Sequence, residues 1–404
     1  MLARSGRNRA SSLVVWSRMG PAVASPVRPR TPPAGGPRGP VVPRSTRVRR
    51  IALVAAVIVL VPVFFSFLAM ATRASNTALN IRAVEWLREN GASEIVAEVE
   101  SLYYTLTAPS KGGPTLKALP KLGYGAGGAN AAYRPPNIEP FIKPALPGEG
   151  VWRATRPSLE GEAPLLITTV RDQPEYPRVL AGVAWINTKK TNIVYYPGRE
   201  EPAVELPSRG PMEVPQELRS SLLATFNSAF KVVDSGGGVI YRGHMYAPMR
   251  DGIATLVGYT DGHVDIISWT SGSTVPAGVS FARQNLDLTV NEGKLAPNIE
   301  NSGEWGATLG GAVLTWRSAA GITAHGDLLY AAGEDQTAAS LAKTLIRAGA
   351  VRAMTLDINP YWTSFISYGA DGGALPRNLL PNMERSDTRY LEPDDRDFFA
   401  VFSK

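Results

Sequence analysis

The sequence predicts an α+β protein: a large, mostly antiparallel β body with one or two packed helices, preceded by a single transmembrane helix. Three observations support this class. Residues 51–72 form an uncharged apolar run. From about residue 151 onward, short stretches typical of β-strands alternate with turn residues. Residues 337–349 have the apolar spacing of an amphipathic helix. With 404 residues, 44% of them apolar, the chain can bury a sizeable core.

Charge is distributed unevenly along the chain. The whole sequence has 42 Lys and Arg against 35 Asp and Glu, which gives a formal net charge of +7. Residues 1–50 hold 11 Arg and no acidic residue, so the other 354 residues carry 31 basic and 35 acidic side chains. The basic character therefore belongs to an N-terminal arm, which its Pro, Gly and Arg content predicts to be disordered. The distribution argues against nucleic acid as a partner of the folded part.

Residues 51–72 are the predicted membrane segment. A helix of this length reaches roughly 33 Å, against about 30 Å for the hydrocarbon layer. The arginines on its N-terminal flank predict a cytoplasmic N-terminus, which would leave the body outside the plasma membrane on a single-pass anchor. The alternative is a cleaved signal peptide, for which Ala69-Met70-Ala71 offers a small-x-small site. The 50-residue arm ahead of the apolar run favours the anchor.

Three further regions follow the membrane segment. Residues 73–107 show helical spacing interrupted at Asn90-Gly91, which predicts a juxtamembrane stalk that packs on a copy of itself or on the body. Residues 108–150 are rich in Pro and Gly and form a predicted linker or wrapping segment. Residues 151–404 form the predicted functional domain.

Within this domain the residue pattern predicts a series of strands and one helix. Thr260-Asp261-Gly262 is a hairpin signal between two of the strands. Thr337 can cap the helix, and Gly349 is placed for a left-handed C-terminal cap. The strand that follows the helix ends at Asp357. The predicted strands are 165–170, 179–186, 192–196, 222–226, 253–259, 264–269, 312–316, 328–332 and 351–358.

Four clusters place polar residues where packing alone would prefer apolar ones. Each cluster also has an ordinary structural interpretation, such as an Asx turn at Asn227 or a surface ion pair of Arg250 with Asp251. Together they offer two carboxylates, two guanidinium groups, amides and aromatic rings, which suit a phosphorylated sugar, since Arg matches phosphate oxygens and rings stack on sugars. The clusters are 224–231, 241–252, 316–321 and 356–362.

Other kinds of site have few candidates. The chain contains no Cys, which excludes disulfides, thiolate metal sites and cysteine nucleophiles. Its three histidines, His244, His263 and His325, are too few for most multi-His metal centres, and we expect no metal site. No phosphate-binding glycine loop, HExxH pair or GxSxG elbow is present.

The order of these motifs, over about residues 222–368, resembles that of the phosphodiester glycosidase family. The residues within the motifs, together with the Arg-rich anchor, resemble an exported bacterial subgroup. The family's Asn-Gly-Gly-Phe-Phe block is similar to 227–231 here, and its Arg-Thr-Ala-Ile-Gly block resembles 317–321. Its Leu-Asp-Gly-Gly-Gly-Ser strand end is similar to Leu356-Asp357. Ile358, Asn359 and Pro360 then replace the glycines, and Pro removes a donor and the freedom to use positive φ.

The resemblance implies hydrolysis at the anomeric carbon of a sugar-1-phosphodiester, with a phosphate monoester as leaving group. Asp357 would be the nucleophile or base and Asp251 its partner carboxylate. Such a glycosidase needs no organic cofactor, and a divalent ion is compatible with it. The implied substrate-binding residues are Arg250 and Arg317 for the phosphate, Asn227 and Asn359 for sugar hydroxyls, and Trp362 and His244.

Two other interpretations remain open at this stage. The first is a catalytically inactive protein that binds a phosphorylated glycan or cell-wall polymer. The second is a structural envelope protein whose working part is the helical stalk. All three interpretations share a membrane contact through one helix.

Overall fold

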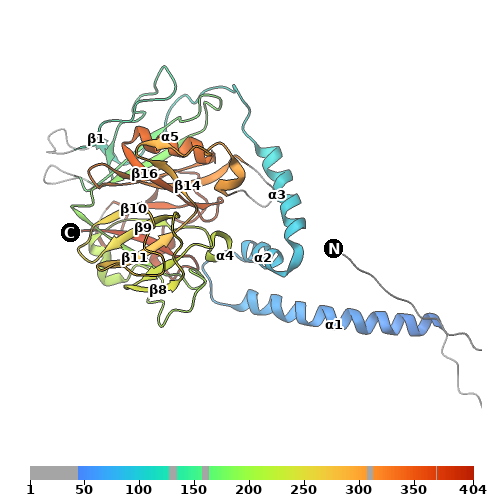
Figure 1. Ribbon diagram of the computed structural model, residues 1–404. Helices are drawn as coiled ribbons and strands as arrows, with labels where there is room; N and C mark the ends of the chain where they lie inside the picture. Colours follow the sequence, from blue (N-terminus) through green and yellow to red (C-terminus); the bar gives the residue numbers. More distant parts are fainter. Residues whose placement is uncertain (1–43, 127–133, 157–162, 307–312, 370) are drawn as a thin grey trace, which may run out of the picture. The chain divides into compact units, whose positions relative to one another are not determined.

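The computed structural model describes residues 44–126, 134–156, 163–306, 313–369 and 371–404 (Figure 1). The chain divides into two compact units, residues 1–63 and 64–404. The predicted arm lies largely outside the described residues. Helix α1 (Arg44–Thr72) contains Pro62, and its segment Ser45–Thr72 is long and apolar enough to cross a membrane. A signal sequence would pass the same test of length and composition.

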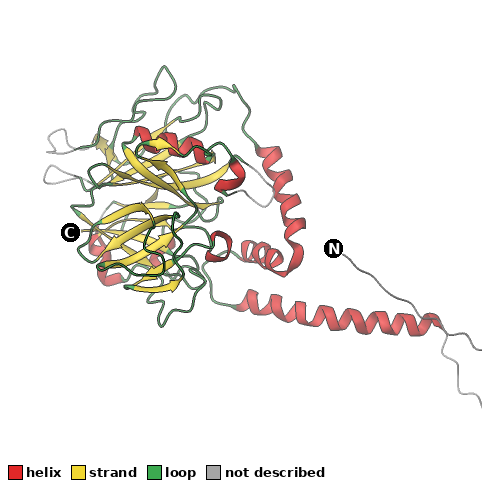
Figure 2. Ribbon diagram, in the orientation of Figure 1, coloured by secondary structure: helices red, strands yellow, loops and turns green. Residues whose placement is uncertain are grey.

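The predicted fold class is confirmed, because the second unit is built mainly from antiparallel sheets with few helices (Figure 2). All strand pairings in the described part of the chain are antiparallel. Sheet A has nine strands, in the order β1 (Tyr124–Ala126), β2 (Arg153–Ala154), β3 (Leu165–Val170), β4 (Ala181–Ile186), β15 (Leu328–Gln336), β14 (Thr315–Thr323), β16 (Ala350–Ile358), β12 (Leu288–Asn291) and β13 (Lys294–Leu295).

Two five-stranded sheets complete the body. Sheet B has the order β18 (Pro376–Asn378), β17 (Phe365–Tyr368), β6 (Leu222–Asn227), β19 (Phe398–Ser403) and β5 (Thr191–Tyr196). Sheet C has the order β10 (Val264–Ser268), β9 (Ala254–Tyr259), β11 (Val279–Gln284), β7 (Val239–Tyr241) and β8 (His244–Ala247).

The helices after α1 are short. They are α2 (Leu79–Leu87), α3 (Ser93–Thr107), α4 (Val232–Ser235) and α5 (Ala338–Arg347), with a π turn at Arg88–Ala92 and 3-10 turns at Gln216–Ser221, Ser302–Trp305, Asp371–Gly373 and Arg389–Leu391. The chain bends between α2 and α3, because Gly91 takes a φ of 89°. Helix α3 contacts the body, since Thr315 Oγ1 donates to the Tyr104 hydroxyl at 3.4 Å.

Sheet A is covered on both faces. Side chains such as Leu165 and Ile167 belong to a core shared with sheets B and C, whereas the intervening Leu166 belongs to a second core under α5. This alternation follows from the period of two in a strand. Because both faces are covered, every residue of β3 and β4 is buried, and their only polar side chains are Thr168 and Thr169.

Helix α5 is formed as the sequence predicts. Thr337 Oγ1 accepts from the Ser340 backbone, Ser340 Oγ accepts from the Thr337 backbone, and Gly349 has a φ of 99°. This capping box orients the helix across β14, β15 and β16. The next strand, β16, then runs to Asp357 and Ile358, as expected.

Most predicted strands agree with the structure within two residues, and the predicted hairpin joins β9 to β10. The strand expected at 312–316 differs, since its first residue lies outside the described residues and the strand runs on to Thr323. Residues 317–321 have little strand propensity, but they are buried between β15 and β16. An added Cβ at Gly321 would meet the Ala350 Cβ at 3.0 Å. Arg317 therefore lies inside the strand and not at its end.

Asp172 follows β3 and is buried against α5. It accepts hydrogen bonds from Gln336 Nε2 at 3.1 Å and Thr344 Oγ1 at 3.3 Å. Burial raises the pKa of Asp172 from 3.8 to about 7, since these bonds offset the desolvation of the carboxylate only in part. The folded chain thus binds more protons here than the unfolded chain. The stability contribution is full below pH 3.8 and is lost as the pH rises through about 7.

Replacing Asp172 by Asn should remove this loss. We expect the D172N variant to be more stable than the wild type at neutral and higher pH, by at least about 1 kcal/mol, with little difference at acidic pH. Denaturant unfolding of the full chain across the pH range measures this. If the free energies of unfolding of the two proteins change with pH in parallel, Asp172 has the pKa of an ordinary carboxyl group.

Candidate functional site

A cavity of about 550 Å³ lies where the end of β16, the chain after β6 and helix α2 meet. Four of its lining residues belong to the predicted cluster at 356–362, and several others are charged. The residues used below are Glu85, Glu89, Lys231, Asp357, Asn359, Trp362 and Arg396.

Asp357 lies in the wall of this cavity with only 6% of its surface exposed. Its backbone N–H donates to the Ser228 carbonyl at 3.0 Å, and its Oδ1 accepts from the Ile358 N–H at 2.9 Å. Its Oδ2 accepts from Arg396 Nη2 at 2.5 Å. Burial raises the pKa of Asp357 to about 6, and the positive charge of Arg396 offsets this effect only in part. The carboxyl is thus tuned toward neutral pH, as many catalytic carboxyl groups are.

Arg396 belongs to the run Asp394–Asp397, which immediately precedes β19. All four side chains are buried. Arg396 lies 4.9 Å from the centroid of the Trp362 ring, and its Nε is buried with no hydrogen-bond partner among the described residues. One donor of Arg396 therefore has no partner in the described part of the chain. The three acidic residues pair elsewhere, Asp394 with Arg389, Asp395 with Arg199 and Asp397 with Arg283.

Helix α2 and the π turn after it supply Glu85 and Glu89 to the cavity lining. Lys231 Nζ, at the start of α4, lies 3.2 Å from Glu85 Oε1 and 3.5 Å from Glu89 Oε1. The side chains of Lys231 and Glu85 are 19% and 15% exposed. This ion pair brings α2 next to α4 (Figure 1). Six acidic residues line the cavity, and two of them, Asp357 and Glu85, are each paired with a cation.

Asn359 directly follows β16 and has a φ of 95°. Asn tolerates a positive φ better than most residues. Its Oδ1 accepts from the Tyr361 N–H at 2.9 Å, which fixes the turn ahead of Trp362. Trp362 itself is 6% exposed, with Arg385, Arg389 and Arg396 around its ring.

Asn227 and Arg317 lie behind the cavity wall, in hydrogen-bond networks. Asn227 donates to Ser318 Oγ at 2.9 Å and accepts from the Tyr330 hydroxyl at 2.8 Å. Arg317 donates to the carbonyls of Trp305 at 2.8 Å and Gly306 at 2.7 Å. Burial lowers the pKa of Arg317 to about 10, so it stays protonated at neutral pH. Both side chains support the strands that present Asp357.

Arg250, Asp251 and His244 lie outside the cavity, on sheet C and its turns, and all three are exposed. Arg250 donates to the Ser235 carbonyl at 3.3 Å. Asp251 accepts from the Gly272 N–H at 2.8 Å and so joins the turn ahead of β9 to the loop after β10. The expected convergence of the four clusters is therefore incomplete, because β7 and β8 carry the second cluster away from β16.

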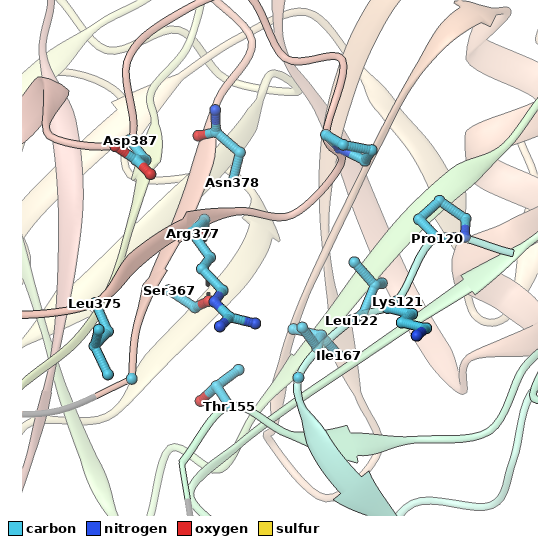
Figure 3. Close-up of a pocket in the computed structure, with 13 residues that line it drawn as sticks. Pro120, Lys121, Leu122, Thr155, Ile167, Ser367, Leu375, Arg377, Asn378 and Asp387 are labelled. Atoms are coloured by element: carbon cyan, nitrogen blue, oxygen red, sulfur yellow. Dashed lines mark hydrogen bonds between the residues drawn. The ribbon is translucent and has the colours of Figure 1, made fainter.

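A second cavity, of about 490 Å³, lies between residues 120–123, β17 and β18. Figure 3 shows the Arg377 side chain reaching between Ser367 and Thr155, with Leu122 and Ile167 on the facing wall. None of the site residues expected from the sequence lines this cavity. We therefore place the candidate site at Asp357.

Arg396, Lys231 and Glu85 were not among the site residues expected from the sequence, although Lys231 lies in the cluster at 224–231. A signal for Arg396 was present, since the charged run Asp394–Asp397 directly precedes the apolar strand 398–403, and charges next to a buried strand need partners. Glu85 had no such signal, because its helix reads as an ordinary amphipathic segment. Within the described ranges, no group of three or more His, Asp or Glu side chains is placed to hold a metal ion.

Comparison with known proteins gives a distant likeness in fold. No family model and no curated protein matches the chain. Among solved structures, the catalytic domain of zebrafish N-acetylglucosamine-1-phosphodiester alpha-N-acetylglucosaminidase, auto-inhibited by its pro-peptide, is similar at 16% identity and a TM-score of 0.39, over 59% of this chain and 82% of that one. A hypothetical protein from Synechocystis (12% identity, TM-score 0.32, 56% of this chain and 59% of that one) and a putative exported protein from Burkholderia pseudomallei (11%, 0.31, 58% and 76%) are also similar.

The ion pair between Lys231 and Glu85 should couple α2 to the body. Changing Lys231 to Met leaves Glu85 without its nearest cation, so we expect destabilisation that the further change of Glu85 to Gln partly reverses. The coupling energy from the double-mutant cycle should be about 1 to 2 kcal/mol. Denaturant unfolding of the four proteins measures it, and strictly additive effects would show that the pair contributes nothing.

Proposed function

We propose that the domain at 151–404 is an extracytoplasmic glycosidase that hydrolyses a sugar-1-phosphodiester linkage in a cell-envelope glycan or glycoconjugate. It would be held at the plasma membrane by α1, with the N-terminus in the cytoplasm. The observation that carries the proposal is the buried Asp357 carboxyl in a cavity wall, paired with Arg396 and having a raised pKa. The resemblance of the motif order points to the same reaction.

The roles follow from the contacts. Asp357 is the nucleophile or base at the anomeric carbon, and Glu85, which faces the same cavity, replaces Asp251 as the partner carboxylate. Arg396 and Lys231 hold the phosphate, in place of Arg250 and Arg317. The bond between C1 and the phosphate oxygen breaks, and water supplies the hydroxyl of the free sugar and a proton. The phosphate monoester departs with its charge stabilised by the two cations.

Asn359 and Trp362 contribute to the sugar side of the cavity. Because Asn359 Oδ1 is used by the turn, its amide N–H₂ is the group that can meet a sugar hydroxyl. Asn227 has a supporting role, since both of its side-chain atoms bond to other residues. His244 lies too far along sheet C to share this cavity.

The competing function is binding of an anionic glycan without turnover. It is favoured by one observation, namely that the cations of the cavity are already paired with carboxylates of the same chain. A ligand would then compete with Asp357 and Glu85 for Arg396 and Lys231. Retention of a phosphorylated glycan on the protein with no sugar released over time would support this function.

Replacing Asp357 by Asn should abolish release of sugar from a synthetic sugar-1-phosphodiester. The amide can still accept from the Ile358 N–H, so the fold should survive, and loss of the nucleophile or base should cost roughly 100-fold or more in kcat. Sugar release by the full chain measures the loss. Asp335 is a matched control, because burial raises its pKa to about 6 as well and it lies outside the cavity. The D335N variant should keep wild-type turnover, and equal turnover in D357N would remove Asp357 from the mechanism.

The pH profile gives a second test. Asp357 must be ionised to act, and burial raises its pKa to about 6. We therefore expect kcat/KM to rise about tenfold per pH unit up to that value and then to level off. An acidic limb centred near pH 4, the range of an ordinary carboxyl, would contradict the raised pKa.

A further inference from the structure

Helix α2 lies between the cavity and the last turns of α1. Glu85, Arg88 and Glu89 line the cavity. Trp86, on the adjacent face, donates from Nε1 to Ser66 Oγ at 3.0 Å and meets the Phe67 ring edge-on, with centroids 5.3 Å apart. The cavity is therefore separated from the last turns of α1 by the width of one helix, about 10 Å.

The contacts on α1 also indicate the depth at which α2 lies relative to the end of that helix. Ser66 and Phe67 are six and five residues before the end of α1 at Thr72, and Met70, whose carbonyl accepts from Arg82, is two residues before it. At 1.5 Å per residue these positions lie roughly 3 to 9 Å inside the end of the helix. Trp and Arg are the side chains that favour the boundary between hydrocarbon and water. With α1 across a membrane, α2 lies at the boundary between the hydrocarbon and the lipid headgroups.

The chain between α1 and α2 holds this arrangement in place. Thr77 Oγ1 donates to Asp395 Oδ2 at 2.8 Å, and Asn76 Nδ2 donates to Asp394 Oδ2 at 3.0 Å. Ser75 also donates to Asp395. The residues directly after α1 are thus fixed to the same buried run that contains Arg396. The cavity cannot move far from the membrane surface without breaking these bonds.

We propose that the substrate is a membrane lipid that carries its sugar on a phosphodiester, so that the alcohol on the phosphate is a long apolar chain in the bilayer. This inference rests on the function proposed above and on α1 as an anchor. The phosphodiester of such a lipid lies directly outside the hydrocarbon boundary, next to α2, which lines the cavity. Helix α2 also exposes apolar side chains suited to lipid, at Leu79, Val84 and Leu87.

The test compares two substrates with the same sugar-1-phosphate group, one esterified to a long isoprenoid alcohol in the bilayer and one to methanol. The full chain is reconstituted in vesicles of zwitterionic and anionic phospholipid. A flexible insertion of about 20 Gly and Ser residues between Arg73 and Ala74 frees the body from α1, because such a linker spans roughly 25 Å, and leaves Ser75–Thr77 attached. The matched control is the same insertion between Gly112 and Gly113, where an added Cβ at Gly112 would meet nothing within 4 Å.

The insertion after Arg73 should lower kcat/KM on the lipid substrate by about tenfold or more, because the effective concentration of the two groups falls. It should leave the methyl substrate unchanged, and the control insertion should change neither. Equal effects on both substrates, or none on the lipid substrate, would overturn the inference while the proposed function stands. A wild type that cleaves neither substrate would overturn the proposed function.

The placement of α2 can be measured without any turnover. Since the chain has no Cys, a single Val84→Cys change allows one fluorescent label. Lipids with nitroxide at the headgroup should quench this label in the otherwise native chain and much less in the chain with the insertion after Arg73. Equal quenching in both proteins, or none in either, would show that α2 is not held at the membrane surface.

Discussion

The buried run Asp394–Asp397 is the constraint on which the site depends. It places three carboxylates and one guanidinium out of water, where a charge without a partner costs several kcal/mol. Each finds its partner in a different part of the chain: Asp394 in Arg389, Asp395 in Arg199 and in the segment after α1, Arg396 in Asp357, and Asp397 in Arg283. Sheet B, sheet C, the end of β16 and the N-terminal segment must therefore be assembled together for all four charges to be satisfied.

This arrangement gives Asp357 its chemical character. Burial raises its pKa, while Arg396 keeps the ionised form accessible, so the carboxyl titrates close to neutral pH. The positions of Asn227 and Arg317 show how the wall is supported: both use their polar atoms on neighbouring strands, which holds β14 and β16 in register behind the site. The residues that support the wall thus lie one layer of strands behind the residues that line the cavity.

Helix α2 connects the cavity to the apolar helix. One face contributes Glu85 to the site and another contacts α1 through Trp86. An amphipathic helix with two different partners has its orientation fixed by both, so its charged face is held toward Lys231. The region predicted as a stalk is therefore part of the site, which accounts for a carboxylate that lies far from the motif blocks in the sequence.

Local sequence patterns predicted most of the helices and nine of the nineteen strands in the described part of the chain. The apolar run predicted α1, the capping residues predicted α5, and the strand endings placed Asp357 at the rim of the core, because these features depend on neighbours a few residues apart. Only the tertiary structure decided which polar residues meet. Arg250 and Asp251 are next to one another in sequence but are carried away on sheet C, whereas Glu85, Lys231 and Arg396 converge from three distant segments. Charged groups pair when they are close in space. The strand order sets these distances, and no single segment of the sequence determines it.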